Sequence, residues 1–226
     1  MKNKLLYFYQ NISIAINFLL FKNFDEKYFI KSKIDDGNVI FDVGSNVGTY
    51  IRLVSKLNKN KSLKIYSFEP NNKLTKTQQK LKLNQKHKLN INNFAIHDKL
   101  KETKFYENAI SSQSTTRDNY ILGKIIDSYK VSCISIDLYC KKNLINNIDL
   151  LKIDTEGDDF NVLLSAKDML ADGKIKFIKI EIENTNDFKR IVNFLNGFNF
   201  RLIGILNQTY KSNELKLFDC YFKLFI

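Results

Sequence analysis

The sequence predicts an α/β fold with a mostly parallel sheet, and three observations indicate it. The run Val39–Val43 has the apolar character of a buried strand. It breaks into a Gly44-to-Gly48 turn that opens a helix, and open α/β sheets bind nucleotide-like ligands at such units. Strands and helices then alternate, and the chain ends in two strands joined by a short polar connection over 207–213, which allows them to pair antiparallel.

The first turn carries two glycines with the spacing Gly44-x-x-x-Gly48, and Asp42 stands just before them. A dinucleotide fingerprint needs three glycines in the pattern G-x-G-x-x-G. The observed spacing therefore favours a ligand with a cationic or zwitterionic end over a pyrophosphate. The alternative is an ordinary tight turn between a strand and a helix.

The second unit is a strand over 64–68 that ends at Glu69-Pro70-Asn71. A carboxylate at this place in a nucleotide-binding sheet accepts hydrogen bonds from ribose hydroxyls, and a solvated charge is the alternative. Pro70 is the only proline of the chain and suits the start of a helix, expected over 71–84. The later elements are expected as strands at 89–94, 101–106, 131–134, 149–153, 176–182, 198–205 and 216–225, and as helices at 158–170 and 187–195.

Three segments resemble the main motifs of FkbM-type methyltransferases: Asp42-Val-Gly-Ser-Asn-Val-Gly48, Phe68-Glu-Pro-Asn71 and Leu151-Lys-Ile-Asp-Thr-Glu-Gly157. The resemblance implies a class I methyltransferase (Rossmann-like) fold, with a seven-stranded mostly parallel sheet, a reversed last strand and helices on both faces. It also implies S-adenosyl-L-methionine (SAM) as cofactor, S-adenosyl-L-homocysteine (SAH) as product, and O-methylation of a sugar, glycan or sugar-containing metabolite.

The resemblance places the cofactor at the ends of the first strands. The turn would cradle the methionine end, Glu69 would bind the ribose, and the adenine contact would rest on Asn93 or on backbone groups. A serine-rich stretch over 111–116 resembles one in the family that would contact acceptor or cofactor. The expected cofactor-binding residues are Asp42, Gly44, Ser45, Asn46, Gly48, Glu69, Asn71, Asn93 and Ala95.

Methylation of a hydroxyl needs a positioned base, and Asp154, Glu156 and Glu181 are the predicted catalytic residues. Asp154 and Glu156 are so close in sequence that they should repel and raise one pKa, which favours a base. Glu181 ends the next strand and resembles the family's late acidic position, which implies that it faces the acceptor. Two alternatives stay open: the three carboxylates hold Mg²⁺, or Glu156 caps the helix that follows while Asp154 orders backbone amides. We predict no metal.

The net charge of +12 has two explanations. One is a polyanionic partner; the other, which we favour, is a compositional bias that spreads lysines over solvated faces. We therefore expect a small-molecule or glycan acceptor and no nucleic acid.

The three cysteines form no C-x-x-C pair, which argues against zinc and fits a reducing cytoplasm. His87 and His97 are expected at the surface. A nucleic-acid methyltransferase and a non-catalytic membrane-associated protein are the alternative functions.

The N-terminal run 5–21 is apolar-rich but is interrupted by polar residues, and no small-residue cleavage site follows it. It is too short and too polar to span a bilayer. Its helical periodicity predicts a helix that packs on the domain or on a second subunit, which leaves a homodimer open. Flanking lysines make an interfacial membrane helix the alternative. We expect an N-terminal helical extension over 1–36 and a methyltransferase domain over 37–226.

Overall fold

The computed structural model describes residues 24–225 apart from 100, 119–120, 122 and 212–213, and describes 207–217 by their backbone alone. The helix predicted over 5–21 lies outside these residues. Helix α2 (Glu26–Lys33) is the first described element, and its Phe29 and Ile30 are buried in the core. The predicted division into 1–36 and 37–226 stays a prediction.

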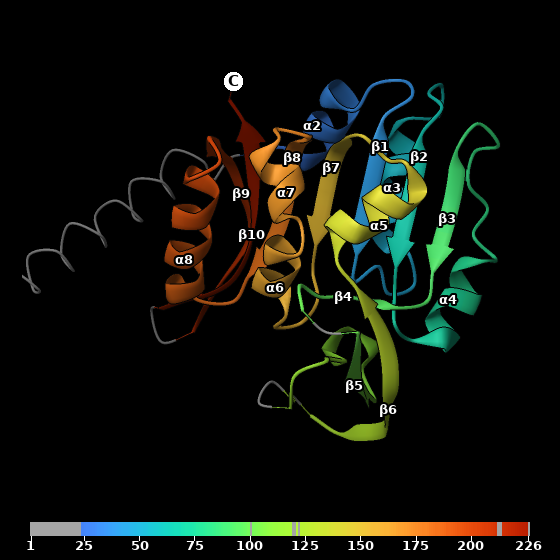
Figure 1. Ribbon diagram of the computed structural model, residues 1–226, viewed down its shortest axis with the longest axis vertical. Coiled ribbons are helices and arrows are strands. Elements are labelled where there is room, and N and C mark those ends of the chain that lie inside the picture. Colours follow the sequence, from blue (N-terminus) through green and yellow to red (C-terminus); the bar gives the residue numbers. More distant parts are fainter. Residues whose placement is uncertain (1–23, 100, 119–120, 122, 212–213, 226) are drawn as a thin grey trace, which may run out of the picture.

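The main sheet has seven strands in the order β3-β2-β1-β7-β8-β10-β9 (Figure 1). All neighbouring pairs are parallel except those of β10, which runs antiparallel to both β8 and β9. The predicted fold class is therefore confirmed. The chain builds outward from β1 to β3 and then returns to β7, so the strand order switches between β1 and β7. The strands are β1 (Val39–Val43), β2 (Lys64–Phe68), β3 (Lys88–Asn92), β7 (Ile148–Ile153), β8 (Ile175–Ile182), β9 (Phe200–Lys211) and β10 (Glu214–Leu224).

Helices cover both faces of this sheet, as predicted, because successive strand residues point to opposite sides. Ile40 and Leu150 belong to one buried cluster with α2 and α3 (Thr49–Leu57). Phe41 and Leu151, one residue further along, belong to the other cluster. That second cluster contains side chains from α5 (Ile136–Asn143), α6 (Asp159–Leu164), α7 (Lys167–Ala171) and α8 (Thr185–Asn196).

A small second sheet has the order β4-β6-β5 and lies beyond the arrowheads of β2 and β7 in Figure 1. It is formed by β4 (Ala95–Ile96), β5 (Glu102–Asn108) and β6 (Ile125–Ile134). The strand predicted at 131–134 is longer than expected because it pairs with β5 along the whole of β5. A 3₁₀ turn, η1 (Ser111–Gln113), follows β5. This sheet brings the serine-rich stretch towards the end of the main sheet.

Two predicted helices are wrong in extent. Helix α4 covers only Asn72–Gln78, because the amides of Lys80 and Leu81 bond three residues back and end the α-helical pattern. The helix predicted over 158–170 is divided into α6 and α7. The carbonyl of Ser165 accepts from the Asp137 amide at 3.0 Å, and the Asp137 carboxylate accepts from the amides of Asp168 and Met169. Asp137 at the start of α5 therefore bonds to a carbonyl and to amides that a continuous helix would use for its own hydrogen bonds.

The two histidines also correct an expectation, since neither is a surface side chain. His87 is buried, and its Nδ1 accepts from the amide of Leu63 at 3.3 Å. The His97 side chain is 13% exposed and has Nδ1 3.0 Å from an oxygen of Asp98. All three cysteines are free thiols. Among the described residues, no helix is both long enough and apolar enough to cross a membrane.

Candidate functional site

A cavity of about 530 Å³ lies at the carboxyl ends of β1, β2 and β7. The strand order switches here, and open α/β sheets bind their ligands at such a point. The predicted site residues that line the cavity are Gly44, Ser45, Asn46, Glu69, Ala95, Asp154 and Glu156. The predicted residues that do not line it are Asp42, Gly48, Asn71, Asn93 and Glu181.

The turn after β1 crosses between the ends of β2 and β7. The amides of Gly44 and Ser45 both donate to the carbonyl of Phe68, at 3.0 and 3.2 Å. Gly44 has φ +71°, and a Cβ at this position would lie 1.8 Å from the carbonyl oxygen of Asp154. Only glycine therefore allows the turn to pack so closely on the end of β7.

Glu69 is a buried carboxylate that lines the cavity. Its Oε2 accepts from the Asn46 amide at 2.9 Å and its Oε1 accepts from the Asn71 amide at 2.8 Å. Burial raises its pKa to about 7, although these two amides oppose the shift. The side chain of Asn93 donates to the carbonyls of Glu69 and Pro70, and Asn71 caps α4. Asn71 and Asn93 thus shape the backbone around Glu69.

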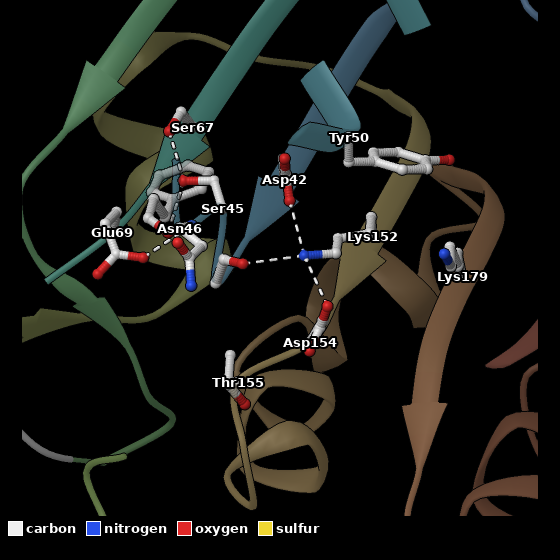
Figure 2. Close-up of polar contacts among 12 residues, drawn as sticks. Asp42, Ser45, Asn46, Tyr50, Ser67, Glu69, Lys152, Asp154, Thr155 and Lys179 are labelled. Atoms are coloured by element: carbon white, nitrogen blue, oxygen red, sulfur yellow. Dashed lines mark hydrogen bonds and ion pairs between the residues drawn. The ribbon is translucent and has the colours of Figure 1, made fainter. Parts of the chain in front are cut away.

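Lys152 forms the floor of the site between the two central strands (Figure 2). Its Nζ lies 3.0 Å from Asp42 Oδ1 and 3.2 Å from Asp154 Oδ2, and it donates to the carbonyl of Gly44 at 2.9 Å. Burial lowers the pKa of Lys152, but the charges of Asp154 and Asp42 outweigh burial and the net shift is upwards. Asp42 is fully buried, and burial raises its pKa against the opposing charge of Lys152.

The structure brings the three predicted catalytic carboxylates together. Asp154, Glu156 and Glu181 each place an oxygen within 4.8 Å of the other two. Burial and then the charge of Asp154 raise the pKa of Glu156 to about 8 and that of Glu181 to about 9. Such a group can exchange a proton near neutral pH, and its spacing would also suit a hard cation with oxygen ligands.

Asp159 holds the turn that carries Glu156. Its carboxylate accepts from the Thr155 amide at 2.8 Å, the Thr155 hydroxyl at 3.1 Å and the Gly157 amide at 3.3 Å. Glu156 itself has φ +54°, an uncommon conformation for a residue with a side chain. Sequence reasoning missed this role of Asp159, although an aspartate two residues after a glycine, at the start of a helix, was an available signal.

The serine-rich stretch forms the outer wall of the cavity, which Ser111, Ser112, Ser114 and Thr116 line. The hydroxyl of Thr115 donates to the carbonyl of Glu156 at 2.7 Å. That of Thr116 donates to Asp158 Oδ2 at 2.9 Å. The small sheet is thereby attached to the turn that carries the catalytic candidate.

The inner end of the cavity contains a second buried lysine that the sequence reasoning missed. Lys179 of β8 is the register partner of Lys152 and also lines the cavity. Its Nζ lies 3.1 Å from Glu26 Oε1 and 3.4 Å from Asp219 Oδ2. The available signal was the same for both residues, since each lysine stands between apolar residues within a strand.

Comparison with known proteins gives one family. Residues 42–202 match the profile described as the methyltransferase FkbM domain. The crystal structure of methyltransferase FkbM from Methylobacillus flagellatus KT has a TM-score of 0.54 and 12% identity. The match covers 83% of this chain and 44% of that chain, so this chain spans less than half the length of that protein.

Two other solved structures are similar to this chain at lower scores. An rRNA methylase from Streptococcus thermophilus has a TM-score of 0.49 and 11% identity, over 88% of this chain and 94% of that chain. A putative rRNA methylase from Clostridium thermocellum has a TM-score of 0.49 and 10% identity, over 87% and 94%. No curated protein matches this chain. At these identities the structural likeness concerns the fold alone.

Proposed function

The chain belongs to the FkbM methyltransferase family, and from this premise we propose that it is a SAM-dependent methyltransferase that methylates a hydroxyl of a sugar, glycan or sugar-containing metabolite. The gathering of Asp154, Glu156 and Glu181 within 4.8 Å at the end of the cavity carries this proposal. A hydroxyl nucleophile must lose a proton during methyl transfer, and a group of carboxylates with raised pKa values can accept it.

The residues of the cavity fit the cofactor. When bound, SAM supplies an electrophilic methyl group on a positively charged sulfur. Gly44, Ser45 and Asn46 border the space for its methionine end, and Glu69 is the carboxylate for its ribose hydroxyls. Apolar side chains form the wall that an adenine would contact, namely Phe68, Ala95, Ile96 and Phe105. Gly48, Asn71 and Asn93 support these residues from behind, and Asp42 acts through Lys152.

We assign different roles to the three carboxylates. Glu156 lines the cavity, and its pKa of about 8 lies closer to neutral pH than that of Glu181, so its ionised fraction is the preferred base. Asp154 lines the cavity beside the Lys152 ammonium, and its charge faces the site of the transferred methyl. Glu181 does not line the cavity, and its pKa of about 9 leaves it protonated at neutral pH, so it assists the other two.

The charge around the acceptor space favours a neutral acceptor over nucleic acid. Among the described residues that line the cavity, the lysines are Lys152 and Lys179, and ion pairs hold both. A phosphate beside the reacting hydroxyl would meet the three carboxylates instead. A nucleic-acid acceptor is the second candidate, favoured by the net charge of +12. Free thiols at Cys133, Cys140 and Cys220 support a cytoplasmic location.

The first experiment is calorimetric titration with SAM and SAH, with NAD as the control ligand. We expect micromolar binding of both SAM and SAH and none of NAD. Transfer of a labelled methyl group is then measured with a panel of sugars and with RNA at increasing salt. Transfer to RNA that declines steeply with salt, and none to sugars, would overturn the sugar assignment.

Asp154→Ala provides the test within the site. We expect this variant to lose methyl transfer while it still binds SAM, because the carboxylate faces the reacting group rather than the ribose. Full transfer by the variant would refute the catalytic role. Liposome flotation with and without residues 1–22 tests the membrane-associated alternative, and the elution volume of the same two chains tests a homodimer.

A further inference from the structure

Lys152 is a buried cation with partners on two sides of the cavity. Its side chain is 6% exposed. Asp42 lies on β1, Gly44 begins the turn after β1, and Asp154 follows β7. The single ammonium therefore contacts the turn proposed for the cofactor and the carboxylate proposed for the acceptor (Figure 2).

Stability by itself does not explain this lysine. Asp42 and Lys152 are register partners on adjacent parallel strands, and their side chains lie on the same face of the sheet. The positions around them in β7 are apolar and fully buried. Replacement of a buried ion pair by well-packed neutral residues is often neutral or stabilising, so the pair is weak evidence for a purely structural role.

The Gly44 carbonyl gives the lysine a positional role. The turn already packs so closely on β7 that a Cβ at Gly44 would lie 1.8 Å from the Asp154 carbonyl oxygen. The ammonium donates to Gly44 at 2.9 Å from below and pairs with the Asp154 carboxylate at 3.2 Å. The turn and the end of β7 are thus both bound by the Lys152 ammonium.

We propose that Lys152 is a positioning residue that couples cofactor binding at the Gly44 turn to the placement of the Asp154 carboxylate. The inference rests on the proposed function, since the ligand at the turn is SAM. Loss of the ammonium removes the donor to Gly44 and the partner of Asp154. SAM binding at the turn then weakens. Ordering of the turn by the ligand also no longer fixes the position of Asp154 at the end of β7.

The test separates this role from simple neutralisation of Asp42. Asp42→Asn alone is the matched reference, since it keeps Lys152 with Gly44 and Asp154. The double variant Asp42→Asn with Lys152→Met removes the ammonium without leaving a buried carboxylate at position 42. We expect both variants to unfold at similar temperatures and the double variant to bind SAM and SAH about tenfold more weakly than the reference, a typical coupling between sites. Equal affinities in calorimetry would overturn the proposal.

Hydrogen exchange of the wild-type protein keeps the proposal testable if the double variant does not fold. SAH should protect the amides of residues 43–48 and of 153–157 together. Protection confined to 43–48 would overturn the coupling. The two possible failures can be distinguished. A wild-type protein that binds neither SAM nor SAH would overturn the proposed function and this inference with it. Binding of SAH without joint protection of the two segments would overturn the inference alone.

Discussion

Replacement of Gly44 by alanine is the most direct perturbation of the cofactor turn. At φ +71° an L-residue is disfavoured by about 1–2 kcal/mol. The new Cβ would also lie 1.8 Å from the carbonyl oxygen of Asp154, and this neighbour is backbone that cannot rotate away. Forced displacement in a packed region costs roughly 1–3 kcal/mol more. We expect the free energy of unfolding to fall by about 2–5 kcal/mol in total.

Gly37→Ala is the matched control, because Gly37 has φ +78° and no atom within 4 Å of an added Cβ. It should show only the conformational cost of about 1–2 kcal/mol. For a chain of this size about 1 kcal/mol changes Tm by roughly 2–4 °C. Gly44→Ala should therefore melt several degrees below Gly37→Ala.

Two assays follow the pair of variants: thermal unfolding by circular dichroism, and calorimetric titration with SAM. The turn must move away from β7 to accept the methyl group, so Gly44→Ala should also bind SAM more weakly, while Gly37→Ala should bind it normally. Equal Tm values for the two variants together with equal affinity for SAM would refute the reasoning, because the close approach at Gly44 would then have no consequence.

Two further predictions concern the carboxylates. Glu69→Ala removes the carboxylate proposed for the ribose hydroxyls, and a hydrogen bond to a charged group contributes about 1.5–3 kcal/mol, so titration should show SAM affinity at least about tenfold lower. It also leaves the amides of Asn46 and Asn71 without their acceptor, which lowers stability. Unchanged affinity would exclude Glu69 from the site. The pKa of Glu156 is about 8 in the folded state against an ordinary value of 4.5. Between these two values the folded state holds a proton that the unfolded chain has released. Stability therefore falls as the pH rises from 4.5 to about 8. Glu156→Gln should therefore melt higher than the wild type at pH 9 and close to it at pH 5; a smaller gap at pH 9 than at pH 5 would contradict this.

Much of the fold is determined by local sequence pattern. The run Val39–Val43 is apolar because β1 is buried on both faces, and glycines follow where the backbone must turn. The alternation of strands and helices is then compatible with only a few orders of strands in the sheet. The same pattern places Glu69 and Asp154 at strand ends, since parallel strands end at one edge of the sheet. These residues were therefore predictable from their places in the chain.

Element boundaries depended on contacts that the sequence does not display. Residues 158–170 have the pattern of one helix, but Asp137 from an earlier helix bonds to Ser165, Asp168 and Met169 and divides it. Strand β6 is long because β5 pairs with it. In both cases a partner distant in sequence supplies hydrogen bonds that compete with the local pattern.

The sequence by itself determined which turn follows the first strand and which carboxylates stand at strand ends, because these follow from order and spacing along the chain. The tertiary structure decided the charge of the site. It buried Asp42, placed Lys152 between two strands and brought Glu181 to within 4.8 Å of Asp154 and Glu156. The reason is physical: a pKa depends on burial and on charges a few ångströms away, and both are set by strands that pair across more than a hundred residues of sequence.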